Sequence, residues 1–209
     1  MMRITEPMTL ATDYLMGACA LVFAVRLLQA AGQAGGWPVR LWAAAMLMTA
    51  TAAFVGGSYH GFVEMLAPDT GQLLWQLTLM ATGIGSAALL ASAVMAGTDG
   101  MLRNALIAAV LVKLAVYLWW MASRTAFIFV IADYGSALLG VVLLAWLARP
   151  TDLTPAAAWI AGGVAVSVVA AAIQALRLAP HPSFNHNDLF HVVQIAALYL
   201  LYRGGLLLR

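Results

Sequence analysis

Seven apolar stretches of about 20 residues follow one another along almost the whole 209-residue chain, with short polar breaks between them. A helix needs about 20 apolar residues to cross the roughly 30 Å hydrocarbon core of a bilayer. Only 9% of the residues are charged, against about 25% in soluble proteins. The sequence therefore predicts an all-α integral membrane bundle of seven transmembrane helices. The breaks are too short for a soluble domain, so residues 1–209 are expected to form a single domain.

Glycine, proline and polar residues place the ends of the predicted helices. The expected ranges are 9–31, 39–62, 71–95, 101–121, 125–148, 155–178 and 188–207, with a turn at 149–152. At the N-terminus, Glu6 offsets Arg3, and Asp13 interrupts the start of the first apolar stretch. This pattern favours a retained first helix over a cleaved signal peptide.

The basic residues predict how the bundle is oriented in the membrane. With the N-terminus outside, the cytoplasmic side carries Arg26, Arg40, Arg103, Arg149, Arg203 and Arg209, and the outer side carries Arg3, Arg124 and Arg177. The positive-inside rule therefore favours an outer N-terminus and a cytoplasmic C-terminus in a multi-pass protein of the bacterial inner membrane. A formal charge of +2 without a Lys/Arg cluster argues against a nucleic-acid partner.

The densest group of ligand-type side chains lies in residues 182–193, where the last predicted helix begins. Asp188 and His191 are three positions apart, and Asn187 and His191 are four apart, so both pairs share a helix face. Asn187 or Asp188 is a good N-cap, which would leave His186 in the entering loop, free to turn back toward His191. The segment is expected to form a loop-to-helix corner with two imidazoles and a carboxylate.

The predicted topology brings the polar side chains to one side of the membrane. His60, His181, His186, His191, Asp13, Asp69 and Asp188 fall on the outer side, and Asp133 and Lys113 lie within the bilayer. Polar groups are costly in hydrocarbon unless they face the bundle interior, so we expect them to converge on one cavity in the outer half. Two alternatives stay open: Asp133 and Lys113 form a structural ion pair, and Asp13 is an interfacial residue at a helix start.

Three neutral imidazoles and a water form the usual catalytic zinc site. The candidate ligands are His60, His186 and His191. Asp188 or Asp69 could orient an imidazole or act as a general base, and Ser58 could hold the water or polarise a carbonyl. The alternative is that the histidines are hydrogen-bonded interfacial and loop residues.

A histidine with a nearby serine late in the second helix, an aspartate near the start of the third and two histidines opening the seventh resemble the heptahelical CREST superfamily. That group includes alkaline ceramidases and progestin and adiponectin receptors. Residues 184–194 and 197–204 are similar to an uncharacterised bacterial branch of it. The resemblance implies zinc bound by His60, His186 and His191. It also implies hydrolysis of an amide or ester in a lipid, with Asp69 and Ser58 as helpers.

The chain departs from the pattern of that superfamily at two places. Gly56 stands four residues before the helix 2 histidine, where the superfamily has serine, and Ser58 stands only two before it. The last two histidines are five apart instead of four, and Asn187 occupies the expected position. Asp188 is then the natural substitute for His186 as third ligand. A metal site that hydrolyses nothing is the other interpretation.

The leading hypothesis is a zinc-dependent intramembrane hydrolase whose lipid-like substrate enters sideways from the outer leaflet. Two other classes of function stay open. His60 and His191 could be axial ligands of a haem from facing helices, and Asp133 and Lys113 could be the ligand or proton groups of a receptor or transporter. A retinal protein is excluded, because the single lysine lies in the fourth predicted helix.

Overall fold

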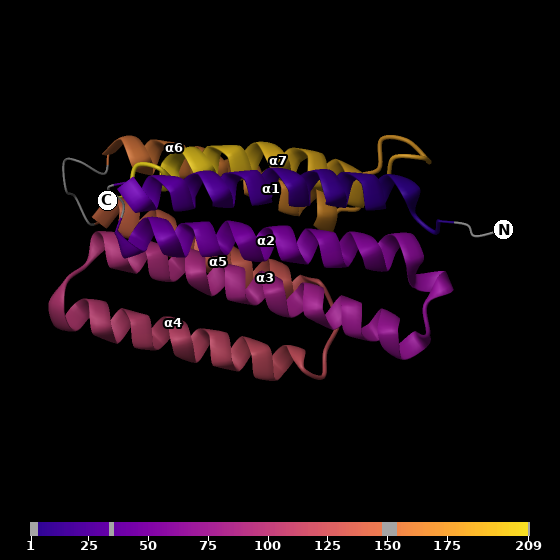
Figure 1. Ribbon diagram of the computed structural model, residues 1–209, viewed down its shortest axis with the longest axis horizontal. Helices are drawn as coiled ribbons and strands as arrows, with labels where there is room; N and C mark the ends of the chain where they lie inside the picture. The colour runs from indigo at the N-terminus through magenta and orange to yellow at the C-terminus, as the bar shows by residue number, and fades with distance from the viewer. Residues whose placement is uncertain (1–3, 34–35, 148–153, 209) are drawn as a thin grey trace.

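The computed structural model describes residues 4–33, 36–147 and 154–208 (Figure 1). These ranges contain the helices α1 (Pro7–Gln33), α2 (Trp37–Phe62), α3 (Pro68–Gly97), α4 (Gly100–Met121), α5 (Ile128–Leu147), α6 (Thr154–Ala175) and α7 (His186–Gly205), and the short 3-10 helix η1 (Val63–Met65). The predicted all-α bundle of seven helices is confirmed. Six of them, all except α7, are long and apolar enough to cross a membrane, so this is a multi-pass membrane protein.

Three helix ends differ from the predicted ends by three residues. α3 begins at Pro68, because proline has a helical φ and suits the first turn, where Asp69 also lies. α5 begins at Ile128, and α6 ends at Ala175, just before Arg177 with its positive φ of 52°. The other described ends agree within two residues. Residues 148–152, which hold the predicted fifth-helix end and turn, lie outside the described residues, as do Arg3 and Arg209 of the charge count.

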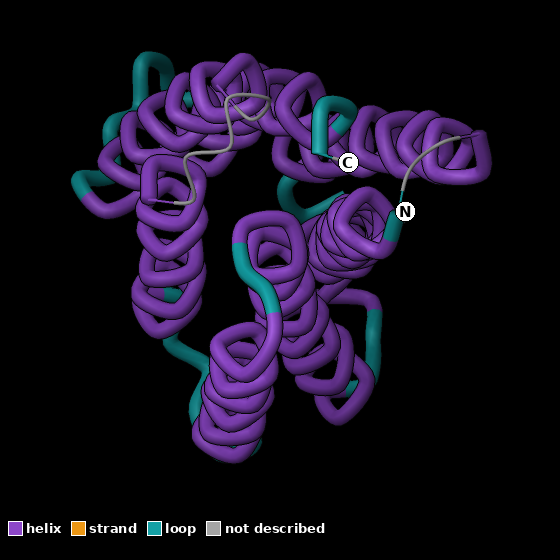
Figure 2. Tube along the Cα trace, turned by 90° about the vertical axis from the view of Figure 1, so that its left-hand side faces the viewer, coloured by secondary structure: helices purple, strands orange, loops and turns teal. Residues whose placement is uncertain are grey.

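Six helices form a closed ring, and α4 lies outside it. Around the ring, α1 packs on α2, α2 on α3, α3 on α5, α5 on α6, α6 on α7, and α7 returns to α1. α4 packs mainly against α3 and lies at the lower edge of Figure 1. Figure 2 shows the helices end on. The outer faces of the helices carry exposed leucine, valine and tryptophan side chains, as expected for surfaces in contact with lipid.

Near the cavity described below, α1 and α2 approach each other closely at Gly57. A Cβ atom added to Gly57 would lie 2.8 Å from Cβ of Asp13 and 2.9 Å from the ring of Tyr14. Any larger residue would therefore push the two helices apart. The absence of a side chain at Gly57 lets Asp13 lie inside the bundle between α1 and its neighbours.

Candidate functional site

A cavity of about 390 Å³ lies within the ring of helices, in the half that contains the start of α1 and the end of α2. Every helix except α4 contributes to its wall, and most of that wall is apolar. Its carboxylate and imidazole side chains are Asp13, His60 and His191, and its amide side chains are Gln174, Asn187 and Gln194. An apolar cavity with a few convergent polar groups is the usual form of a small-molecule site.

The central polar contact of the cavity joins α1 to α7. The Nε2 atom of His191 lies 3.1 Å from Oδ1 of Asp13, and its Nδ1 atom lies 3.0 Å from the hydroxyl of Thr12. Asp13 is 4% exposed and His191 7% exposed. Two ionisable groups are therefore held together in the interior, with both ring nitrogens of the histidine in polar contacts.

A proton on His191 or Asp13 would make the 3.1 Å contact between them favourable. The Thr12 hydroxyl also lies 3.0 Å from the carbonyl of Met8 and 3.1 Å from that of Thr9. When Thr12 donates to one of these carbonyls, Nδ1 of His191 donates to Thr12, and one further proton is shared between Nε2 and Asp13. That arrangement has no net charge, which the apolar interior favours. The pair is thus able to hold and transfer one proton.

The position of His191 follows from how α7 begins. Asn185 is the N-cap: its side chain accepts from the backbone N–H of Asn187 at 2.7 Å and of Asp188 at 3.4 Å. Asp188 closes the capping box by accepting from the N–H of Asn185 at 2.7 Å. The predicted N-cap at Asn187 or Asp188 is therefore wrong, and His186 is the first helical residue instead of a loop residue.

Asp188 also ties α7 to α1. Its second carboxylate oxygen accepts from the hydroxyl of Thr9 at 2.8 Å, and the side chain is 1% exposed. Thr9 and Asp188 are 179 positions apart, as are Thr12 and His191, so the parallel helices α1 and α7 keep one register. With both oxygens in use, Asp188 anchors the helix pair, and it is not among the residues that line the cavity.

His60 reaches the same cavity from the last turn of α2. Its Nδ1 atom lies 3.3 Å from Oε2 of Glu6, and its ring stands edge-to-face to Trp75 at 6.0 Å. The side chain is 19% exposed. Helices 2 and 7 therefore bring two of the three candidate metal ligands, His60 and His191, to one cavity.

The third candidate ligand, His186, does not join them. It is five positions from His191, about 140° round the helix, and does not line the cavity. Asn187 lines it instead, at the position four before His191. Over residues 4–33, 36–147 and 154–208, no three His, Cys, Asp or Glu side chains are grouped so that they could hold a metal ion.

The other predicted helpers also lie away from the cavity. Asp69 is exposed in the first turn of α3. The Ser58 hydroxyl contacts the Phe54 carbonyl at 2.7 Å and the Tyr14 hydroxyl at 2.9 Å. The structure thus places neither residue where the sequence analysis expected it.

Lys113 and Asp133 form an ion pair between α4 and α5. Lys113 Nζ lies 2.5 Å from Oδ1 of Asp133, and the Ser86 hydroxyl of α3 donates to the other carboxylate oxygen at 2.5 Å. Neither Lys113 nor Asp133 lines the cavity, so their expected role as cavity residues is corrected in favour of the structural ion pair.

Sequence reasoning missed three polar residues at the start of the chain. Glu6, just before α1, contacts His60, and Thr9 and Thr12 of α1 contact Asp188 and His191. The spacing of Glu6 and Thr9 from the candidate Asp13, at i, i+3 and i+7, is the signal that could have indicated two of them, because such residues share one helix face. Asp13 itself lies nearly two turns inside the helix, which excludes the alternative of a residue at the helix start.

The sequence pattern of a family of unknown function, DUF6962, matches residues 8–209. This range begins one residue after the start of α1 and includes every residue that lines the cavity. No curated protein and no solved structure matches the chain.

Proposed function

The chain belongs to DUF6962, a family of unknown function, and we propose that it is an intramembrane hydrolase that cleaves an amide or ester bond in a lipid-like substrate. The observation that carries the proposal is the buried Asp13–His191 pair in the wall of an apolar cavity. A carboxylate and an imidazole held together out of water are a typical acid–base pair. The resemblance to the CREST superfamily, with its ceramidases, supports the choice of reaction and substrate.

The cavity supports a lipid-like substrate by its size and its opening. Its volume of about 390 Å³ lies in the range of small-molecule sites, roughly 300–1,000 Å³. Val168 of α6 lines the cavity and is nevertheless 61% exposed. Gly135 of α5 also lines it and is exposed, with open space beside its Cα. The substrate therefore enters from the lipid between α5 and α6, in the half of the bundle that the charge count assigns to the outer leaflet.

In this mechanism, Asp13 is the general base. Its Oδ1 faces His191, and its Oδ2 accepts no hydrogen bond from any described residue. Oδ2 takes a proton from a water molecule as the water oxygen attacks the substrate carbonyl. His191 stabilises the carboxylate and is itself oriented by Thr12. The bond to the leaving oxygen or nitrogen then breaks, and that atom receives the proton from Asp13.

Asn187 is the candidate donor to the carbonyl oxygen of the substrate. Its own side-chain oxygen accepts from Gln174 at 2.9 Å, which fixes the amide orientation. Its amide N–H groups have no partner among the described residues, and the residue lines the cavity. A fixed N–H donor stabilises the negative charge that develops on the carbonyl oxygen.

The predicted zinc ligands do not fit a zinc site, because His186 lies away from His60 and His191. In the proposed mechanism, Asp13 and His191 therefore carry the proton transfer. The placement of His186 can be tested directly by measuring the zinc content of purified wild type and of the variants His60→Ala, His191→Ala and His186→Ala. We expect His186→Ala to keep the wild-type content, and a loss of bound zinc in that variant would contradict the placement of His186.

The test of the proposed function is hydrolysis of a panel of lipid esters and amides by the protein in nanodiscs, with product release measured by mass spectrometry. We expect wild type to cleave at least one member and Asp13→Asn to lose activity on the order of 10²–10⁴-fold. Asp69→Asn is the matched control, because it removes an exposed aspartate away from the cavity and should keep wild-type activity. Equal rates for wild type and Asp13→Asn, or no cleavage at all, would refute the proposal.

A further inference from the structure

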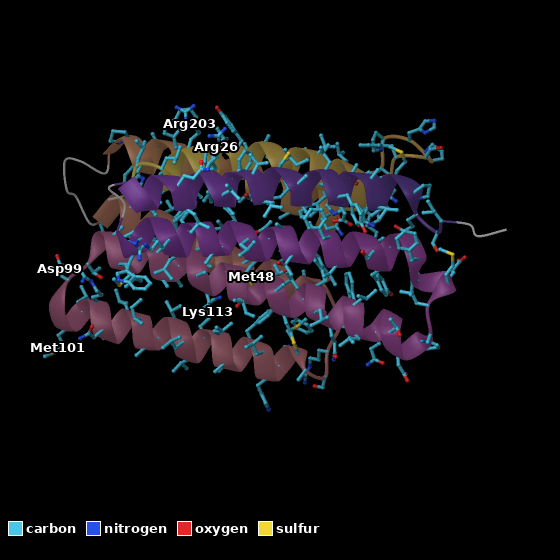
Figure 3. All side chains as sticks on the ribbon, in the orientation of Figure 1. Arg26, Met48, Asp99, Met101, Lys113 and Arg203 are labelled. Atoms are coloured by element: carbon cyan, nitrogen blue, oxygen red, sulfur yellow. The ribbon has the colours of Figure 1, made fainter. Side chains whose placement is uncertain are left out.

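The seam between α1 and α7 continues past the cavity into an aromatic cluster. Phe23 of α1 stacks on Tyr202 with ring centroids 4.8 Å apart and lies 6.2 Å from Tyr199. α1 and α7 are parallel, and their register pairs each residue of α1 with the residue 179 positions later on α7. Arg26, one turn after Phe23, is therefore level with Gly205, two residues after Arg203. Figure 3 shows Arg26 and Arg203 on the same edge of the bundle.

Arg203 is held in a fixed orientation. Its Nη1 donates to the Tyr199 hydroxyl at 3.0 Å, and its guanidinium carbon lies 4.5 Å from the centroid of the Trp159 ring of α6. A guanidinium stacked on an aromatic ring keeps its remaining N–H donors at the edge of its plane. Arg203 is therefore prepared to bind a planar or tetrahedral anion with two donors at once.

The two arginines have no acidic partner among the described residues, although another arginine at the same end of the bundle has one. Arg103 pairs with Asp99, whereas neither Arg26 nor Arg203 lies within ion-pair distance of a described carboxylate. Arg26 is exposed and Arg203 half-buried. Two positive charges on one seam thus face outward without a described counter-charge.

The depth of the pair matches the level of lipid headgroups. Arg203 lies two residues before Gly205, the last residue of α7, and Arg26 seven before Gln33, the last of α1. These separations correspond to about 3 Å and 10 Å along a helix. Long arginine side chains reach along the protein surface to the headgroups, and tryptophan and tyrosine prefer the same level.

We propose that Arg26 and Arg203 form a binding site for the phosphate of an anionic phospholipid headgroup. The site lies at the end of the bundle opposite the cavity, and it does not depend on the proposed hydrolase activity. Its position on the lipid-facing surface of α1 and α7 favours a lipid phosphate over a soluble one. Tyr199 and Trp159 hold the Arg203 donors, and Arg26 adds the second charge.

The test uses wild type, Arg26→Gln, Arg203→Gln and the double variant in nanodiscs of phosphatidylcholine and phosphatidylglycerol. Each protein is extracted from the nanodiscs, and native mass spectrometry counts the phosphatidylglycerol molecules that stay bound to it. We expect the preference for phosphatidylglycerol over phosphatidylcholine to fall about fivefold in each single variant, because one basic residue at a membrane surface contributes about that much to the binding of anionic lipid. The preference should fall further in the double variant. Arg40→Gln is the matched control: Arg40 is an exposed arginine over Trp37 on α2, and this variant should bind as wild type does.

Two results would overturn the proposal. The first is undiminished preference in the double variant, or an equal loss in Arg40→Gln, which would mean that overall charge sets the preference. The second is displacement of the lipid by millimolar inorganic phosphate, which would assign the site to a soluble anion. Since Arg26 is exposed and makes no described hydrogen bond, Arg26→Gln keeps the test valid even where Arg203→Gln unfolds the protein.

Discussion

The described part of the chain contains two interior pairs of opposite ionisable groups, Lys113 with Asp133 and Asp13 with His191, and the two pairs differ in what surrounds them. Lys113 and Asp133 are satisfied by each other and by Ser86, and they join α4 and α5 to α3 away from the cavity. Asp13 and His191 also contact each other, but both line the cavity, and one oxygen of Asp13 has no described partner. The first pair therefore has the geometry of a structural link and the second that of a reactive site.

This comparison shows why an ionisable residue inside a membrane is not by itself a functional residue. All four side chains are interior groups that the sequence marks as candidates. What distinguishes them is whether an oxygen or nitrogen remains directed at a space that a ligand can fill.

Beside Asp13→Asn, the largest effect on this comparison is expected for His191→Gln. Glutamine can still hydrogen-bond to Asp13 or Thr12, but it cannot carry the positive charge that stabilises the carboxylate. We expect hydrolysis of the cleaved lipid to slow on the order of 100-fold, with the unfolding midpoint little changed. Unchanged turnover in His191→Gln would show that the Asp13–His191 pair is structural, like the Lys113–Asp133 pair.

The next effect is expected for Asp133→Asn. The substitution leaves Lys113 without its partner in a site where the lysine side chain is 25% exposed. Breaking a fully buried pair costs roughly 3–5 kcal/mol, and partial exposure reduces this, so we expect a loss of about 2 kcal/mol of unfolding free energy. Turnover per folded molecule should stay at the wild-type level. Denaturation in mixed detergent micelles and an activity assay on the same sample measure both quantities.

A smaller effect is expected for Asn185→Ala. The substitution removes the side-chain oxygen that accepts from the N–H groups of Asn187 and Asp188 at the start of α7. Loss of such a cap costs about 1 kcal/mol. Asn185→Asp keeps the capping oxygen and serves as the control, with near wild-type stability. Equal stability of the alanine and wild-type proteins would show that the register of α1 and α7 does not depend on the cap.

The smallest effect is expected for the double variant Lys113→Met, Asp133→Leu. Replacing both members of an interior ion pair by apolar residues of similar volume is often neutral or stabilising. We expect an unfolding free energy within about 1 kcal/mol of wild type, and retained turnover. A double variant as unstable as Asp133→Asn alone would show that Lys113 and Asp133 each contribute through contacts other than the one between them.

The sequence predicted the helices better than the site. Helix number and most ends follow from apolar length, proline and glycine, which act over a few neighbouring residues. Of the candidates that the sequence offers, His60, His191 and Asp13 line one cavity. Asp188, Asp69 and Ser58 were placed in the site as well, because a polar residue near a cavity and one that lines it have the same sequence signal. His186 was included because the start of α7 was placed two residues too late.

Apolar length and composition by themselves determined that this chain is a seven-helix membrane bundle, because crossing hydrocarbon requires a fixed number of apolar residues that satisfy their own backbone. Only the tertiary structure decided which polar residues share a cavity. Asp13 meets His191 because Gly57 lets α1 approach α2 and because Thr9 and Asp188 fix the register of α1 against α7. These contacts join residues up to 179 positions apart, and spacing along the chain shows which residues share a helix face but not which face of another helix they meet.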